Sequence, residues 1–251
     1  MFLFCEGSHK TDNPYFLSLP ENSTNPKQNQ YMFFPEIHVA RWFYESGYAE
    51  KPLIHWILDT FISPDTNFVD IGAHVGTYAW TCGKKANHTY AFECGPTTFC
   101  YLAANIALQG LEEKISPLPF ALGDEEKTIE YYVRSKDGGG NGVKQLHTSD
   151  TNCKTQTIQM KTLDSFHLNN IGCIKIDVEG FEKEVLIGGR ETLQRNNYPP
   201  ILFESWGSWK EKEGIPADTI RNDLFQYIES IGYQIQTISG AQDMFLATWP
   251  S

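Results

Sequence analysis

The sequence is short of positive charge and has no long apolar run, and each shortage excludes a class of protein. Lys and Arg number 20 against 31 Asp and Glu, so the formal net charge is −11. Duplex nucleic acids are bound mainly by Lys and Arg that neutralise phosphates, and the absence of a basic run disfavours such a partner. No apolar stretch reaches the roughly 18–20 residues that span a bilayer. The start of the chain also lacks the basic segment of a secretory signal, so we expect a cytoplasmic protein without a membrane span.

Several glycine and cysteine motifs are missing as well. The six cysteines include no Cys-x-x-Cys pair, which is typical of reduced, mostly buried thiols in a cytosolic protein. A dinucleotide-binding turn reads Gly-x-Gly-x-x-Gly, but alignment on Gly72 places Asp70 and Val75 at the other two glycine positions. The Gly-rich segment 138–142 lacks the Gly-Lys-Ser/Thr end of a P-loop. We interpret this segment as a mobile loop beside a binding site or as a plain linker.

The residues that are present divide the chain into an N-terminal part and one larger domain. Residues 1 to about 35 are rich in Asn, Pro, Ser and Lys without a period, which predicts a loop or extension. Residues 36–62 carry apolar and aromatic side chains at helical spacing. We therefore interpret residues 1–62 as an extension with capping helices and residues 63–251 as one domain.

This domain begins with a regular alternation of strands and helices. The pattern predicts strands over 67–71, 89–93 and 115–122, with helices over 77–86 and 98–108 between them. Strands and helices that alternate in this way form a parallel sheet through right-handed crossovers.

The second half of the domain departs from this alternation and then returns to it. Residues 128–133 and 157–161 alternate like antiparallel strands. Further patterns predict strands over 173–177 and 200–204, helices over 182–195 and 219–231, and a terminal hairpin of strands 233–238 and 244–249. The hairpin makes the last strand antiparallel to its neighbour. We thus expect an α/β fold with a mostly parallel sheet, an antiparallel final strand and helices on both faces.

The turn after the first strand is a candidate binding site. It reads Asp70-Ile-Gly-Ala-His-Val-Gly76 and leads into a helix whose free N–H groups favour the carboxylate end of a ligand. The next strand ends in Glu93, which can accept hydrogen bonds from both hydroxyls of a ribose. An acid at position 70 suits a pyrophosphate poorly. These residues therefore favour a nucleoside with a cationic amino-acid head.

At this point the sequence resembles the class I S-adenosylmethionine (SAM)-dependent methyltransferases, and later motifs narrow the resemblance to the FkbM family. The motifs are Thr162-Leu-Asp-Ser-Phe166, Ile174-Lys-Ile-Asp-Val-Glu-Gly-Phe-Glu182, Val185-Leu-Ile-Gly-Gly189 and Phe203-Glu204. The sequence departs from the family at Cys94, where a proline is usual. The resemblance implies a Rossmann-like class I methyltransferase sheet. It also implies an O-methyltransferase acting on a hydroxyl, often of a sugar or polyketide-like molecule.

The resemblance further implies roles for individual residues. Around SAM, the turn residues would line the methionine end, Glu93 would bind the ribose, and the segment 120–124 would lie near the adenine. The cofactor-binding set is Asp70, Gly72, Ala73, His74, Gly76, Glu93, Ala121, Leu122 and Asp177. Asp177 would lie beside the sulfonium, while Lys175, Glu179 and Glu204 would face the acceptor.

Methyl transfer to an alcohol also needs a group that accepts the hydroxyl proton. Asp177 and Glu179 can both reach the cleft if the chain bends at Gly180, and we prefer Asp177 as this base. Lys175 lies on the same strand face as Asp177 and could simply pair with it. His147, after the Gly-rich loop, is a second candidate base.

Two further possibilities concern the surroundings of Glu204. Together with Asp177 and Glu179 it could bind Mg²⁺, although we expect no metal because these carboxylates already have a catalytic use. Nearby aromatic side chains could stack on a sugar face or pack in the core; they are Tyr198, Trp206 and Trp209.

The sequence therefore predicts a SAM-dependent O-methyltransferase for a small acceptor, most readily a sugar or glycan. An RNA 2′-O-methyltransferase is the alternative enzyme, because it also places Lys, Asp and Glu around a sugar hydroxyl. The net charge of −11 counts against RNA. A module that holds SAM without turnover is the non-enzymatic alternative.

Overall fold

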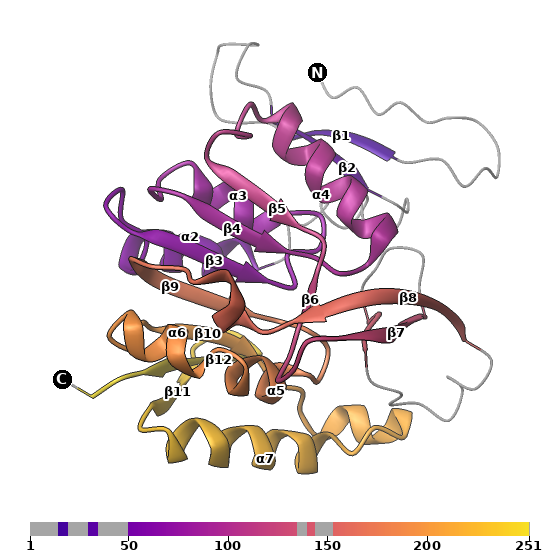
Figure 1. Cartoon of the computed structure of the whole chain (residues 1–251), viewed down its shortest axis with the longest axis vertical. Coiled ribbons are helices and arrows are strands. Elements are labelled where there is room, and N and C mark those ends of the chain that lie inside the picture. The colour runs from indigo at the N-terminus through magenta and orange to yellow at the C-terminus, as the bar shows by residue number, and fades with distance from the viewer. Residues whose placement is uncertain (1–14, 20–29, 35–49, 135–139, 144–152, 251) are drawn as a thin grey trace.

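A seven-stranded sheet forms the centre of the molecule (Figure 1). The structure is a computed structural model that describes residues 15–19, 30–34, 50–134, 140–143 and 153–250. In spatial order the strands are β11 (Gln234–Ile238), β12 (Ala241–Thr248), β10 (Ile201–Glu204), β9 (Ile171–Ile176), β3 (Asn67–Ile71), β4 (Thr89–Phe92) and β5 (Ile115–Leu118). The strands from β10 to β5 are parallel, whereas β12 runs antiparallel to both of its neighbours. The predicted α/β sheet with an antiparallel final strand is confirmed.

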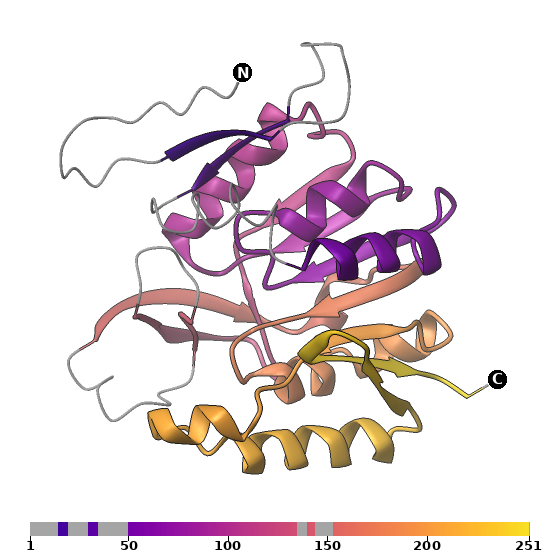
Figure 2. The same cartoon turned by 180° about the vertical axis from the view of Figure 1, so that it is seen from behind.

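Helices cover both faces of this sheet (Figure 2). The first face carries α2 (Lys51–Thr60), α3 (Thr77–Gly83) and α4 (Pro96–Leu108), and the second carries α5 (Glu182–Ile187), α6 (Arg190–Arg195) and α7 (Ala217–Ser230). The alternation of side chains along β3 explains the two layers. Phe68 packs with α2 and α3, while Val69 and Ile71 pack with the helices of the second face.

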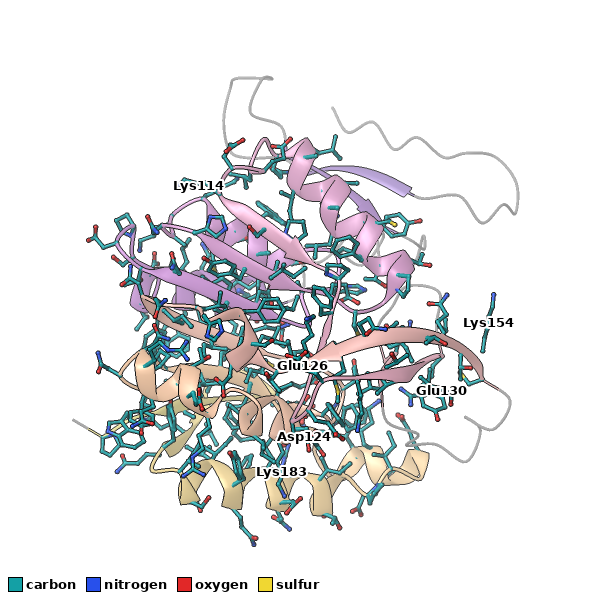
Figure 3. All side chains as sticks on the ribbon, in the orientation of Figure 1. Lys114, Asp124, Glu126, Glu130, Lys154 and Lys183 are labelled. Atoms are coloured by element: carbon teal, nitrogen blue, oxygen red, sulfur yellow. The ribbon has the colours of Figure 1, made fainter. Side chains whose placement is uncertain are left out.

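A small second sheet projects from the end of the main one. It consists of β6 (Ala121–Leu122), β8 (Lys154–Lys161) and β7 (Lys127–Val133), and β7 pairs with β8 in antiparallel fashion as predicted. Charged side chains such as those of Glu130 and Lys154 lie exposed on it (Figure 3). The prediction of one strand over 115–122 is wrong, because the chain leaves the main sheet after Leu118 and enters the small one at Ala121.

Two further predictions need correction. The single helix over 182–195 is broken into α5 and α6 at Gly188-Gly189. Gly188 approaches the backbone so closely that a Cβ atom there would lie 1.9 Å from the carbonyl oxygen of Gly123. The N-terminal extension is not all loop, because β1 (Tyr15–Leu19) and β2 (Gln30–Phe34) form an antiparallel hairpin. These two segments are rich in aromatic residues, which favour strands.

The described helix of the N-terminal part is α2, which begins one residue before Pro52. The rest of the predicted capping region, residues 36–49, lies outside the described residues. Within the part of the chain that the structure describes, no helix combines the length and apolar character needed to cross a membrane.

Candidate active site

A cavity, here called the first cavity, opens at the carboxyl ends of β3, β4 and β9, the edge at which parallel α/β sheets bind ligands. The predicted residues that line it are Gly72, Ala73, His74, Glu93, Ala121, Leu122, Lys175, Asp177 and Glu179. The structure does not place Asp70, Gly76 or Glu204 on its wall. Direct cofactor contact, which we expected of Asp70 and Gly76, is therefore not supported by their position.

Gly72 joins the two loops that form the floor of the first cavity. Its φ of +78° lies in the left-handed region, and a Cβ atom there would lie 1.7 Å from the carbonyl oxygen of Asp177. The amide of Asp177 donates to the carbonyl of Ile71 at 3.0 Å. Glycine is therefore required at position 72 for contact between two backbones, and this contact fixes where Asp177 lies.

Glu93 is buried at the end of β4 and orders the loops around it. Its Oε2 accepts the amide of His74 at 2.9 Å, and its Oε1 accepts the amide of Gly95 at 2.8 Å. Burial raises the pKa of this carboxyl, and the nearby His74 and the two backbone donors oppose the rise. Each oxygen of a carboxylate keeps further acceptor capacity, so Glu93 can still accept hydroxyl groups from the cavity.

Lys175 supplies the positive charge under the first cavity. Its buried ammonium lies 3.2 Å from Oδ2 of Asp177 and 3.6 Å from Oδ1 of Asp70, and it donates to the carbonyl of Gly72 at 2.8 Å. Burial alone lowers the pKa of Lys175, but the carboxylates of Asp177 and Asp70 raise it overall. The group therefore stays charged and holds Asp177 in place. Asp70, fully buried, acts on the cavity through Lys175.

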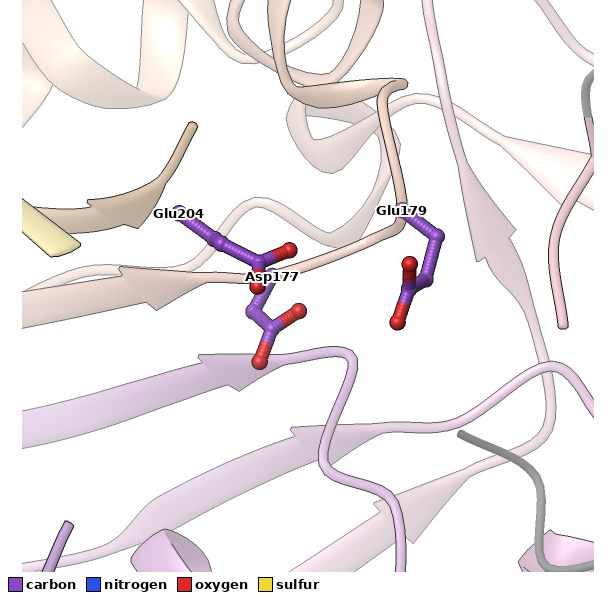
Figure 4. Close-up of side chains that lie close together, drawn as sticks. All are labelled: Asp177, Glu179 and Glu204. Atoms are coloured by element: carbon purple, nitrogen blue, oxygen red, sulfur yellow. The ribbon is translucent and has the colours of Figure 1, made fainter. Parts of the chain in front are cut away.

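Three carboxyl groups gather where β9 and β10 end (Figure 4). Asp177 follows β9, Glu204 ends β10, and Glu179 is brought back by positive φ angles at Glu179 and Gly180, which is the predicted bend. Their oxygens lie within 4.8 Å of one another. The sequence placed these residues at neighbouring strand ends, and the structure brings them together into one group, here called the acidic triad.

Crowding within the acidic triad alters its titration. Burial and then the charge of Asp177 raise the pKa of Glu179 to about 7. The same two causes raise the pKa of Glu204 well above its usual range, and its buried Oε2 has no hydrogen-bond partner among the described residues. Two carboxylates cannot donate to each other, so the triad needs either a proton or a cation. Its three oxygen donors could hold a hard divalent ion such as Mg²⁺.

Glu182 holds the bend between the first two members of the triad. It begins α5 as predicted, and its Oε1 accepts the amides of Val178 and Gly180, each at 3.1 Å. Burial raises its pKa to about 7. The carboxyl therefore fixes the loop that carries Glu179 without lining the first cavity.

Several wall residues carry no motif and were missed from the sequence. They are Glu50, Tyr78, Tyr131 and Asn141. The hydroxyl of Tyr78 donates to Oε2 of Glu50 at 3.0 Å. Contacts between positions this far apart in the chain depend on the tertiary fold, so no local spacing could have indicated them.

The remaining sequence candidates lie elsewhere. His147 is outside the described residues. Tyr198 stacks on Trp249 with ring centroids 3.7 Å apart, whereas Trp206 packs with Ile215 in a separate cluster. The three aromatic residues near Glu204 therefore do not form one platform for a sugar.

Strand order and the cavity at the carboxyl ends of the parallel strands are those of a Rossmann-like α/β fold. A family model described as "Methyltransferase FkbM domain" matches residues 70–235, and the chain belongs to this FkbM methyltransferase family. The curated hexuronic acid methyltransferase AglP of Haloferax volcanii is 28% identical over 150 residues. That alignment covers 60% of this chain and 60% of the relative, so it leaves part of each protein unmatched.

Solved structures agree on the fold. An FkbM methyltransferase from Methylobacillus flagellatus KT superposes with a TM-score of 0.50 at 18% identity, covering 74% of this chain and 44% of that one. A precorrin-6y C5,15-methyltransferase from Geobacter metallireducens GS-15 also gives 0.50, at 11% identity, covering 82% of this chain and 92% of its own. At such identities the similarity concerns the fold.

Proposed function

We propose that this protein is a cytoplasmic, SAM-dependent O-methyltransferase that methylates a hydroxyl of a small acceptor, a sugar or glycan. The observation that carries the proposal is one cavity lined both by Glu93 at the end of β4 and by Asp177 and Glu179 after β9. Glu93 can accept hydrogen bonds from a ribose. Asp177 and Glu179 can stabilise a cationic centre and accept the proton of a hydroxyl. The relative's name, a hexuronic acid methyltransferase, supports a sugar acceptor.

The residues present in the first cavity fit SAM. Glu93 would accept the ribose hydroxyls, the turn residues from Gly72 to His74 would line the methionine end, and Asp177 would lie beside the sulfonium. Phe92, Phe120 and Leu122 offer an apolar surface for the base. SAM, when bound, supplies an electrophilic methyl group. The cavity measures about 230 Å³, below the usual range for sites of drug-sized ligands.

The chain's own part in the reaction is to orient the acceptor hydroxyl and remove its proton. Glu179, with a pKa of about 7, is half ionised near neutral pH, which suits a general base. Asp177 lies in a fixed position beside Lys175 and shares the same wall. We propose that one of these two carboxylates accepts the proton, Asp177 being preferred because Lys175 and the contact at Gly72 hold it rigidly.

Single-turnover methyl transfer by Asp177→Asn and Glu179→Gln tests this assignment. Loss of the base is expected to slow transfer by about 10²–10⁴-fold. If Glu179 is that base, the wild-type rate should rise with pH through about 7 and this rise should be lost in Glu179→Gln. Exposed Glu191→Gln serves as the control. Unchanged rates in both variants would remove the two residues from the mechanism.

Two further measurements test the wider proposal. Calorimetry that detects neither SAM nor S-adenosylhomocysteine binding would overturn it. A methylated sugar whose yield is insensitive to salt agrees with it, whereas activity on RNA that falls steeply with salt indicates the RNA enzyme instead.

A further inference from the structure

A second cavity lies beside the first, between α2 and the β11–β12 hairpin. It measures about 890 Å³. Pro52, Leu53 and Trp56 of α2 form one wall, the hairpin forms the other, and Glu204 lies between them. Because β12 is antiparallel to β10, the hairpin turn lies at the edge where the parallel strands end. Both cavities therefore open at the same edge of the sheet.

The acidic triad connects the two cavities. Glu204 lines the second cavity, Asp177 and Glu179 line the first, and their carboxyl oxygens lie within 4.8 Å of one another. Glu50 lines both. A molecule in the second cavity would thus present a hydroxyl to the candidate bases while a cofactor occupied the first.

The walls of the second cavity have the chemistry of a carbohydrate site. Trp56 is 38% exposed and offers an aromatic face on which the C–H side of a sugar ring can pack. Residues with polar side chains that can exchange hydrogen bonds with hydroxyl groups lie along the hairpin wall: Gln236, Ser239 and Gln242. Such a combination of one aromatic face, two amides and a hydroxyl suits a polyhydroxylated ring.

The charge of this cavity restricts which sugar can occupy it. The described residues that line it include three carboxylates, Glu50, Glu204 and Asp243, and no Lys, Arg or His. Asp243 is held by the amide of Gly207 and the indole of Trp209, each at 3.0 Å, and by an ion pair with Arg221, whose guanidinium lies 3.4 Å from its Oδ1. A ring that bears its own carboxylate would face these acidic side chains and would meet no Lys, Arg or His among the described residues of the wall.

We propose that the second cavity is the acceptor site and that it selects a neutral sugar ring over a uronic acid. The inference rests on the proposed function and deepens it. It separates this chain from its relative AglP, whose name specifies a hexuronic acid.

The test compares methyl glucopyranoside with the methyl glycoside of glucuronic acid, which differ only at C6, a hydroxymethyl group in the first and a carboxylate in the second. Methylation of each by the full chain is followed by mass spectrometry, and binding in the presence of S-adenosylhomocysteine is followed by saturation-transfer NMR. We expect kcat/KM, or the binding affinity, to be at least about tenfold higher for the neutral sugar than for the glucuronide. Preference for the glucuronide, or no binding of either sugar, would overturn the inference.

Three variants locate the effect. Trp56→Ala is expected to raise the sugar KM or Kd by about tenfold, the loss of one aromatic contact, and to leave S-adenosylhomocysteine affinity unchanged. Trp249→Ala is the matched control, because Trp249 is 39% exposed at the opposite edge of the sheet. Gln242→Lys, at an exposed position near the start of β12, should narrow the preference against glucuronide several-fold.

The outcomes separate this inference from the proposed function. If Trp56→Ala and Trp249→Ala change sugar binding equally, or if Gln242→Lys leaves the sugar preference unchanged while the cofactor still binds, the assignment of the second cavity as the acceptor site is wrong. Absence of cofactor binding in calorimetry would instead overturn the function itself.

Discussion

The two cavities are built in different ways, although they meet at the acidic triad. The first is framed by loops tied to each other through backbone contacts, the Glu93 hydrogen bonds and the buried Lys175 ion pairs. The second lies between helix α2 and the β11–β12 hairpin, and residues of these two elements make up nearly all of its lining. We infer that the first cavity tolerates little change, whereas the second can vary in side chains without loss of the fold.

The strongest test of this contrast compares two glycines with similar backbone angles. Gly72→Ala should lower the free energy of unfolding by about 3 kcal/mol or more, because its Cβ would collide with the backbone of Asp177. Gly240→Ala in the hairpin has a φ of +82° but no atom within 4 Å of the new Cβ, so it should cost only about 1 kcal/mol. Chemical denaturation measures both. Similar losses in the two variants would contradict the contrast.

A smaller effect, on cofactor binding, is expected from Glu93→Ala, which changes the first cavity alone. Removal of its charged acceptors should weaken S-adenosylhomocysteine binding by about 100-fold, while binding of the neutral sugar changes little. Calorimetry measures the first and NMR the second. Glu130→Ala, on the exposed strand β7, is the control. An unchanged cofactor affinity would remove Glu93 from the site.

The pH dependence of stability sharpens the comparison further, because Glu182 lies under the first cavity. Its pKa is about 7 in the folded state against a usual value of 4.5. Below about 4.5 the group is neutral in both states. As pH rises towards 7 only the unfolded chain releases the proton, so stability falls and stays lower above 7. Glu182→Gln can still accept both amides and removes this loss.

The corresponding measurement is denaturation of wild type and Glu182→Gln from pH 4.5 to 8. The variant should gain stability relative to wild type with rising pH, by an amount on the order of 3 kcal/mol. Exposed Glu229→Gln provides the matched control. If the free energies of unfolding of wild type and Glu182→Gln change with pH in parallel, the pKa of the Glu182 carboxyl is not raised in the folded state.

The smallest effect is expected from chelation. Lys175 already compensates Asp177 at 3.2 Å, and the raised pKa of Glu204 indicates that the triad can hold a proton instead of a cation. We therefore expect methyl transfer to change by less than about twofold after treatment with EDTA. Activity that is lost and then restored by Mg²⁺ would assign a metal to the triad and contradict this expectation.

The first cavity was more predictable from the sequence than the second, for a physical reason. Gly72, Glu93 and Asp177 stand at ends of strands in a repeating strand–helix pattern, and such ends meet at one edge of a parallel sheet. Trp56 and Gln242 approach each other only because β12 runs antiparallel and α2 packs on the first face of the sheet. No local spacing encodes that approach.

Errors in the fold prediction have similar causes. The apolar pattern over 115–122 is continuous, but the chain changes sheets within it. The pattern over 182–195 is helical, yet close packing of Gly188 on Gly123 interrupts the helix. Asp70, expected at the cofactor because it stands beside the glycine turn, lies buried beside Lys175, its register partner in β9. Periodicity specifies faces of elements, and tertiary contacts decide the rest.

The reversed direction of β12 has an evolutionary consequence. It puts a short exposed turn, Ser239-Gly240, next to the reaction edge, and exposed turns accept insertions and exchanges readily. A few substitutions in this turn could therefore change which acceptor is methylated, while the first cavity stays as it is. The same turn is a natural place to randomise when the enzyme is to be retargeted in the laboratory.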